Sequence, residues 1–480
     1  MSPKCPVPSL GECAITELAE SLMRALATAS DELEATLCLI DLCSYFEKCN
    51  ATTDVYQDLL QAILCTDYLN PLCRFLSMQL LLKETVTFLA TGMFPVSYYE
   101  RLLQVISVQG SGLKTLNMKG VWVKEENMYY LFDIVRKLKN LNRLTIPYIA
   151  NDELLHHIGE SCANLKFLDI SGETDITEIG IQSLYTGVTR EALTVVDIGI
   201  LGEENICHTD IAELIYNLPN LINLVTYSFV GKAIHHIYTR KSKHFRSKLN
   251  YVHDTDTDLR TMNSIVEICP EVECLYLDNP GHGVVSKIDQ LKLTKLKLHN
   301  FRCVDLHLLL ERCGDTLIHL SVIQGRGTID FSKLAEHCPN LTGLEIYMMD
   351  SLVKSDDTNF LNAQNLEILH SKIPNSVLSY LITHTPKLKR LSVGDVNFTD
   401  DDIFRVFNNT EFPYLEDVWF LNASYLSTAS VEVMMDRCPM LTILGQLSGW
   451  NVTYEDLELM RTMISSANTK LTLLPNGILP

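Results

Sequence analysis

Histidine and cysteine side chains have the widest chemical range in this 480-residue chain, because both can bind metals and transfer protons. The pairs His156-His157 and His235-His236 are adjacent residues, which face different directions on a helix. They therefore favour solvated histidines over metal ligands. The 15 cysteines include no C-x-x-C pair, and several recur at one position of a repeat. We expect buried, structural cysteines rather than a metal site.

Catalytic motifs are absent from the sequence, which has no GxxxxGK[ST], GxGxxG, HExxH or GxSxG pattern. No acid, base and nucleophile occur together in a recognisable arrangement. We therefore expect no enzymatic activity and no cofactor, which leaves binding as the function to look for.

Composition narrows the class of partner. The formal net charge is −20, from 59 acidic and 39 basic residues, and this argues against nucleic-acid binding. The N-terminus has no basic segment followed by an apolar one, and no apolar run approaches the roughly 20 residues of a membrane span. The sequence predicts a cytoplasmic and/or nuclear protein with no membrane partner.

The element that organises the chain is the stretch Cys338-Pro339-Asn340-Leu341-Thr342-Gly343-Leu344-Glu345-Ile346. Its L-x-x-L-x-L core predicts a helix end, a loop asparagine and a short strand. Asn340 is expected to hydrogen-bond the backbone of a neighbouring coil. One such unit cannot bury its own apolar face, so copies must stack.

The first leucine position of this unit recurs every 21 to 30 residues from Leu113 to Leu471, including Leu366 and a degraded copy at Leu249. This spacing is typical of helix-containing leucine-rich repeats. It predicts about 14–15 repeats over residues 111–480, each with one strand and one helix. The predicted fold class is α/β, a leucine-rich-repeat solenoid (horseshoe) with parallel strands on its concave face.

Restarts such as Cys269-Pro270-Glu271-Val272 and Cys438-Pro439-Met440-Leu441 resemble the cysteine-containing, ribonuclease-inhibitor-like repeats of F-box/leucine-rich-repeat and Zyg-type receptors. The resemblance covers about residues 111–480. It implies a substrate-recognition subunit of a cullin-RING ubiquitin ligase. The alternative is a leucine-rich-repeat scaffold or regulator unrelated to ubiquitination.

Residues 1–110 contain no L-x-x-L-x-L unit and predict an all-helical adaptor or cap domain. The apolar periodicity predicts helices over 15–27, 32–48, 54–64, 75–88 and 97–108. This segment has no tryptophan and no Leu-Pro opening, so we expect no standard F-box.

The N-terminal segment Ser9 to Leu18 resembles the elongin-binding box of Zyg-type receptors, with the pattern S-L-x-x-x-[C/A]-x-x-x-L. Leu10, Ala14 and Leu18 would share one face of a helix that inserts into a partner's groove. An elongin/cullin partner is implied by this resemblance. An ordinary amphipathic helix with a serine N-cap gives the same pattern.

Residues between the leucines alternate away from the core and are expected to face a partner on the concave surface. In the middle and late repeats they form an aromatic and basic strip within an acidic protein, and such residues are enriched at binding hot spots. The strip would suit an acidic or phosphorylated segment of a partner protein. The residues predicted to bind the partner are Tyr276, Lys297, His299, His319, Glu345, Tyr347, His370, Lys372 and Trp419.

The one dense basic run, residues 240–248, lies where the repeat pattern degrades. It is compatible with a nuclear-localisation or phosphate-binding loop, and an exposed irregular insertion is the favoured interpretation.

Overall fold

The computed structural model describes residues 4, 8–27, 32–49, 51–66, 70–172, 175–199 and 206–476. The chain divides into two compact units, an N-terminal unit of residues 7–249 and a C-terminal unit of residues 250–480 with residues 1–6. Both are leucine-rich-repeat arrays, so the predicted fold class is confirmed. Among the described residues, no helix is both long and apolar enough to span a bilayer.

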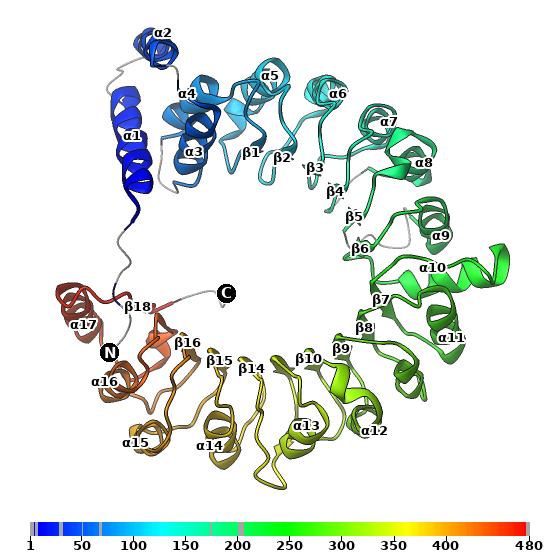
Figure 1. The fold of residues 1–480 in the computed structure, drawn as a ribbon, viewed down its shortest axis with the longest axis vertical. Helices are drawn as coiled ribbons and strands as arrows, with labels where there is room; N and C mark the ends of the chain where they lie inside the picture. Colours follow the sequence, from blue (N-terminus) through cyan, green and yellow to red (C-terminus); the bar gives the residue numbers. More distant parts are fainter. Residues whose placement is uncertain are drawn as a thin grey trace. The chain divides into compact units, whose positions relative to one another are not determined.

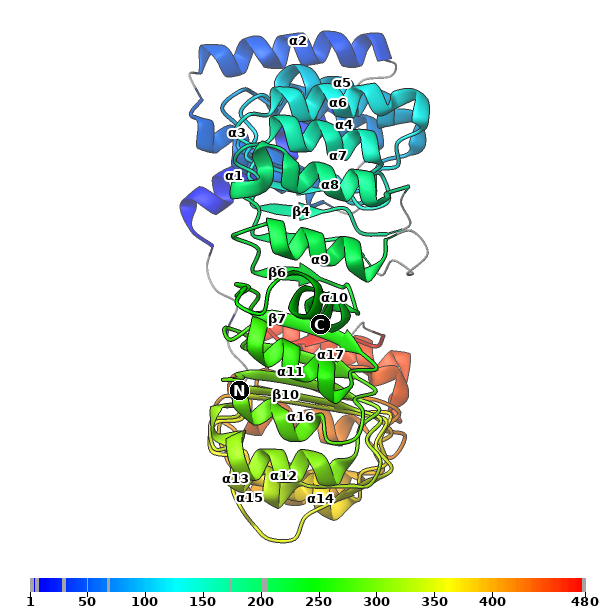
Figure 2. The same cartoon turned by 90° about the vertical axis from the view of Figure 1, so that its right-hand side faces the viewer.

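The N-terminal unit joins a group of helices to a six-stranded parallel sheet with the order β1-β2-β3-β4-β5-β6. Helices α6 to α9 follow one another along this unit (Figure 2). Its helices are α1 (Leu10–Ala27), α2 (Glu32–Lys48), α3 (Thr53–Leu64), α4 (Pro71–Leu81), α5 (Tyr99–Gln109), α6 (Met128–Lys137), α7 (Asp152–Ser161), α8 (Glu178–Thr186), α9 (His208–Asn217) and α10 (Val230–His236). Its strands are β1 (Phe88–Ala90), β2 (Thr115–Asn117), β3 (Arg143–Thr145), β4 (Phe167–Asp169), β5 (Val195–Asp197) and β6 (Asn223–Val225).

Strand β1 corrects the prediction that residues 1–110 are all helical. Helix α4 ends at Leu81 rather than at Phe88, and β1 pairs in parallel with β2, with Leu89 opposite Leu116. The β-branched residues around Val86 favour a strand over a helix there. The side chain of Gln57 on α3 bonds the backbone of Thr87 and Phe88 at 2.9 to 3.1 Å, which covers the free edge of the sheet.

The C-terminal unit contains a ten-stranded parallel sheet with the order β18-β17-β16-β15-β14-β12-β10-β9-β8-β7. Its strands lie on the inner side of the array and its helices on the outer side (Figure 1). The sheet strands are β7 (Tyr251–Thr255), β8 (Cys274–Asp278), β9 (Lys295–His299), β10 (His319–Ile323), β12 (Gly343–Tyr347), β14 (Asn365–Leu369), β15 (Arg390–Val393), β16 (Asp417–Phe420), β17 (Ile443–Gly445) and β18 (Thr472–Leu473). The short strands β11 (Thr328–Asp330) and β13 (Ser351–Val353) pair separately. The helices are α11 (Leu259–Ile268), α12 (Cys303–Cys313), α13 (Phe331–His337), α14 (Asn375–Thr383), α15 (Asp400–Asn409), α16 (Thr428–Arg437) and α17 (Tyr454–Ser466).

Cysteines at the helix ends are part of the core. Cys162, Cys269, Cys338 and Cys438 each follow the last residue of a helix, and none is more than 2 % exposed. Burial raises the pKa of the Cys162, Cys338 and Cys438 thiols to about 12. These cysteines are therefore buried, unionised side chains, as the repeat position predicts.

Side-chain amides and carboxylates link successive repeats. Asn340 donates from Nδ2 to the carbonyl oxygen of Asp315 at 2.8 Å, which confirms the role predicted for it. Asp152, at the start of α7, accepts from the backbone N and Oγ1 of Thr177 at 2.8 and 2.6 Å in the next repeat. The first of these bonds lies at the surface, and the Asp152 bonds satisfy polar groups that stacking partly buries.

Candidate partner-binding face

The strand face of the C-terminal unit carries the residues between the leucines. Leu275 and Leu277 on β8 are buried, whereas Tyr276 between them is partly exposed, as alternation along a strand requires. The pairing register aligns equivalent residues of neighbouring strands into rows. We define the middle row as His253, Tyr276, Lys297, Ser321, Glu345, Glu367, Ser392 and Trp419.

The first part of the middle row is a stack of three side chains from β7, β8 and β9. The rings of His253 and Tyr276 are parallel within 11°, with centroids 4.0 Å apart. The Lys297 ammonium lies 4.6 Å from the Tyr276 centroid, a cation–π distance. Burial lowers the pKa of His253 to about 4, an effect that Lys297 reinforces and Asp278 opposes. At neutral pH the positive charge of this stack therefore belongs to Lys297.

Two histidines beside the middle row are paired with carboxylates. His299 Nδ1 lies 2.8 Å from Asp278 Oδ1, and its Nε2 lies 3.1 Å from Gln324 Oε1. His319 Nε2 lies 3.1 Å from Glu345 Oε1, and this hydrogen bond lowers the pKa of Glu345. Each histidine is thus held in a defined orientation, at side-chain exposures of 30% and 33%.

Further along the face, hydrogen bonds orient Tyr347 and Arg390. Tyr347 donates its hydroxyl to Glu367 Oε1 at 2.6 Å, and burial together with this acceptor raises its pKa. Arg390 Nε lies 3.1 Å from Asp417 Oδ2, but burial still raises the pKa of Asp417 above its usual value. These pairs continue the polar surface from β12 to β16.

Trp419 is a correction to the predicted strip. Its side chain is only 2 % exposed, so it offers no surface to a partner. The ring lies over Gly445 of the next strand, where an added Cβ would come within 2.0 Å of Trp419 Cε3. The missing side chain of the glycine leaves room for the ring to lie flat and become buried.

His370 and Lys372 do not lie on a strand, which is a second correction. Leu366 pairs with Leu344, so it fills the second leucine position of its repeat rather than the first. Ala363, fully buried, occupies the first position. The residues that face outward from β14 therefore include Glu367, which the sequence pattern missed, whereas His370 and Lys372 follow the strand in a loop.

The predicted elongin-type box lies on the first turns of α1. Leu10 is 87% exposed, Ala14 is also exposed, and Leu18 is partly covered. Ser9 and Glu12 cap the helix reciprocally, with Ser9 N donating to Glu12 Oε2 at 2.7 Å and Glu12 N to Ser9 Oγ at 3.1 Å. The helix is therefore well formed at its start, although Leu10 lacks cover from the rest of the unit.

Two other exposed apolar surfaces of the N-terminal unit were not predicted from the sequence. On α2, Leu33, Leu37 and Ile40 are 70, 56 and 58% exposed at helix spacing. In the loops after β2 and β3, the rings of Trp122 and Tyr148 stack with centroids 5.4 Å apart, at exposures of 59% and 52%. Exposure of large apolar side chains could not be inferred from periodicity alone.

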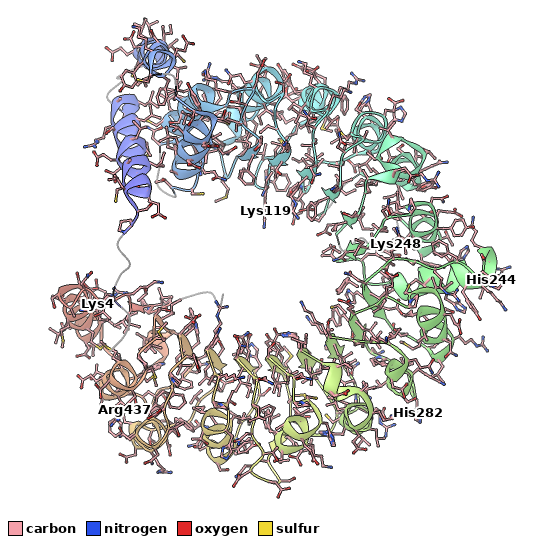
Figure 3. All side chains as sticks on the ribbon, viewed as in Figure 1. Lys4, Lys119, His244, Lys248, His282 and Arg437 are labelled. Atoms are coloured by element: carbon pink, nitrogen blue, oxygen red, sulfur yellow. The ribbon has the colours of Figure 1, made fainter. Side chains whose placement is uncertain are left out.

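The basic run 240–248 is partly engaged within its own unit. Lys241 Nζ lies 2.6 Å from Glu213 Oε1, and Lys248 Nζ donates to Asn220 Oδ1 at 2.7 Å. The Phe245 ring packs 5.0 Å from that of Tyr216. His244 lies away from the strands of the unit (Figure 3). An irregular loop anchored on α9 accounts for these contacts.

Within the described ranges, no group of three or more His, Cys, Asp or Glu side chains is arranged to hold a metal ion. His156 faces Glu160 at 3.3 Å as a solvated histidine, whereas His157 is only 9 % exposed, so the prediction of a solvated side chain is wrong for His157.

Comparison with known proteins gives a likeness of fold. No protein-family model matches the chain, and no curated protein matches it significantly. Among solved structures, the complex of Rad7 and Elc1 from yeast matches at 14% identity and a TM-score of 0.46, over 81% of this chain and 94% of that one. An internalin from Listeria monocytogenes matches at 16% identity and a TM-score of 0.35, over 80% and 95% of the two chains. A TLR13–ssRNA13 complex matches at 12% identity and a TM-score of 0.34, over 84% and 54%. The leucine-rich-repeat assignment rests on the strand and helix pattern of the chain itself.

Proposed function

We propose that this chain is a non-enzymatic receptor that holds a protein partner on the strand face of the C-terminal unit. The observation that carries the proposal is the row of oriented side chains from His253 to Glu367. Most of these side chains are held by neighbours on the strand face, in the stack at Tyr276 and in the bonds of Glu345 and Glu367, and they remain partly open to solvent. Ser321, in the middle of the row, is buried. A rigid surface of this kind loses little conformational entropy when a partner binds.

Charge supports an acidic partner segment at Lys297. The protein carries a net charge of −20, so a local cation on the strand face stands out against the general field. Lys297 meets the Tyr276 ring rather than a carboxylate, and its ammonium group remains available to a partner.

A charge-reversal pair tests this face. Lys297→Glu combined with Lys372→Glu should abolish capture of the partner in a pull-down from cells. The matched control is Lys333→Glu combined with Arg437→Glu, on helices α13 and α16, and it should leave capture intact. Undiminished capture by the protein with both Lys297→Glu and Lys372→Glu contradicts the proposal.

We further propose that α1 recruits an elongin-type adaptor, which would make the chain a substrate-recognition subunit of a cullin-RING ubiquitin ligase. Support comes from the position of Leu10 and Ala14 on one exposed face of a capped helix, the form in which a helix enters a partner's groove. The alternative is a leucine-rich-repeat scaffold with no link to ubiquitination.

Purification of the full chain from cells separates these two functions. The ligase proposal predicts that elongin and cullin co-purify, that Leu10→Asp removes them, and that Val108→Asp does not. Val108 is a suitable control because it is 73% exposed on α5 of the same unit. Absence of both proteins from the wild-type preparation favours the scaffold.

A further inference from the structure

A polar hollow of about 690 Å³ lies beyond the carboxyl ends of β9, β10, β12 and β14. Its polar lining comes from successive repeats and consists of Asn300, Gln324, Arg326, Asp350, His370 and Lys372. It adjoins the strand face, because Gln324 also meets His299. The sequence pattern did not predict this hollow. It placed His370 and Lys372 on a strand.

Backbone contacts fix the loops that carry the cations. Arg326 donates its backbone N to Phe301 O at 2.7 Å, and its own carbonyl accepts from Cys303 N at 3.1 Å. The preceding residue, Gly325, has no room for a side chain, since a Cβ would lie 2.7 Å from Phe301 Cζ. Arg326 is thus presented from a rigid turn.

The loop with His370 and Lys372 is fixed in a similar way. His370 has a φ of 53°, in the left-handed region, directly after β14. Ser371, only 1 % exposed, donates to Leu369 O at 3.1 Å and accepts from Met349 N at 2.9 Å. With Ser371 turned inward, its two neighbours line the hollow. Residues at the same place in the neighbouring repeats share this left-handed conformation, so the turn is a feature of the repeat.

The cations of the hollow are not neutralised within the described part of the chain. Arg326 donates from Nη2 to the neutral Asn300 Oδ1 at 3.0 Å, and neither Arg326 nor Lys372 forms an ion pair there. Asp350 is the carboxylate of the lining, and it pairs with neither of them. Two unpaired cations in a hollow of an acidic protein make a site for an anion.

We propose that this hollow binds a phosphorylated side chain of the protein partner, with Arg326 and Lys372 holding the phosphate. The inference rests on the proposed function, because the segment that carries the phosphate would lie along the adjoining strand face. The fork of a guanidinium matches phosphate oxygens, and a lysine adds a point charge. A phosphate monoester carries close to two negative charges, so it gains more from the two cations than a carboxylate would, in spite of Asp350.

The surroundings favour a phosphopeptide over a nucleic acid. Asp350 lines the hollow, and further carboxylates lie on the adjoining strand face at Asp278, Glu345 and Glu367. A chain of phosphates would bring a negative charge to each of these groups, whereas a peptide can place its phosphate in the hollow and its acidic group at Lys297.

The test uses the full-length protein and a short peptide, acetyl-Gly-phosphoserine-Gly-amide, followed by ³¹P NMR. The peptide should bind saturably in the millimolar range, and Arg326→Ala or Lys372→Ala should each weaken binding at least about fivefold. Lys333→Ala, on the helix side, should leave binding unchanged. Thermal melting checks that each variant is folded, and Lys372→Gln is a second, milder variant.

Three results would overturn the proposal. The first is that the phosphopeptide shows no saturable binding up to about 10 mM. The second is that the unphosphorylated peptide binds equally well. The third is that a single-stranded oligonucleotide binds more tightly than the phosphopeptide and that the same variants abolish its binding. The pull-down with Lys297→Glu alone separates this inference from the proposed function. If Lys297→Glu leaves partner capture intact while the phosphopeptide still binds the hollow, the strand face fails and the phosphate site stands.

Discussion

Acidification should destabilise the C-terminal unit through His253. The imidazole stacks on Tyr276 in a half-buried position, and partial burial lowers its pKa from 6.5 to about 4. The unfolded chain therefore binds this proton at a higher pH than the folded chain does. Stability is fully present above about pH 7.5, falls as the pH drops through 6.5, and falls no further from this source below about pH 4.

The size of the effect follows from the two pKa values. One pKa unit is worth about 1.4 kcal/mol, so the complete difference would be about 3 kcal/mol, of which about 2 kcal/mol is reached at pH 5. The imidazole is partly exposed, and solvent screening reduces this to about 1 kcal/mol.

Urea unfolding at pH 7.5 and pH 5 measures the loss. Trp419 and Trp450 report on the C-terminal unit, so the background variant is Trp122→Phe, which removes the tryptophan of the N-terminal unit. His253→Gln removes the titrating group but keeps a polar side chain of similar size. Other groups titrate in both proteins, so the quantity of interest is the difference between their pH dependences.

We expect His253→Gln to lose about 1 kcal/mol less than its parent between pH 7.5 and pH 5. Equal losses in both proteins would refute the reasoning, because they would show that His253 takes up its proton as easily in the folded unit as in the unfolded chain.

Three other substitutions or reactions test the packing of the repeats. Gly445→Ala should destabilise the protein by about 3 kcal/mol in urea unfolding, because its Cβ would lie 2.0 Å from the Trp419 ring; an unchanged midpoint would contradict the close contact. Asn340→Ala should cost about 1 kcal/mol in the same assay through loss of the bond to Asp315, and a neutral effect would mean that water replaces it. In the folded protein at pH 8, iodoacetamide should label the exposed Cys13 and leave Cys338 unlabelled, because the pKa of Cys338 is about 12. Peptide mapping after denaturation measures the labelling of both cysteines. Rapid labelling of Cys338 would argue against its burial.

Most of the repeat architecture could be predicted from the sequence, because leucine alternation has a direct structural cause. Where two leucines flank one outward residue, as around Tyr276 and Lys297, the strand and its exposed position follow from the pattern. The degraded unit predicted at Leu249 leads into β7, even though Asp254 takes the place of a core leucine. Helices α1, α2 and α3 follow apolar periodicity in the same way.

The misplacements have identifiable physical reasons. Alanine at position 363 fills a leucine slot, so the pattern moved to Leu366 and shifted the predicted outward residues by three positions. Trp419 is on the predicted strand, but its exposure depends on Gly445 in the following repeat. In these positions, contacts between neighbouring repeats determine which side chains are exposed. The sequence pattern of a single repeat carries no information about those contacts.

Site-specific photocross-linking in cells tests most directly whether a protein partner occupies the strand face of the C-terminal unit. A photoreactive amino acid at Ile323 would lie between His299 and Tyr347 without replacing any proposed contact residue. The control position is Leu308, 51% exposed on α12. We predict one discrete cross-linked partner from Ile323 that is absent from Leu308 and is lost with Lys297→Glu. The same cross-links from both positions, or none from Ile323, would contradict the account.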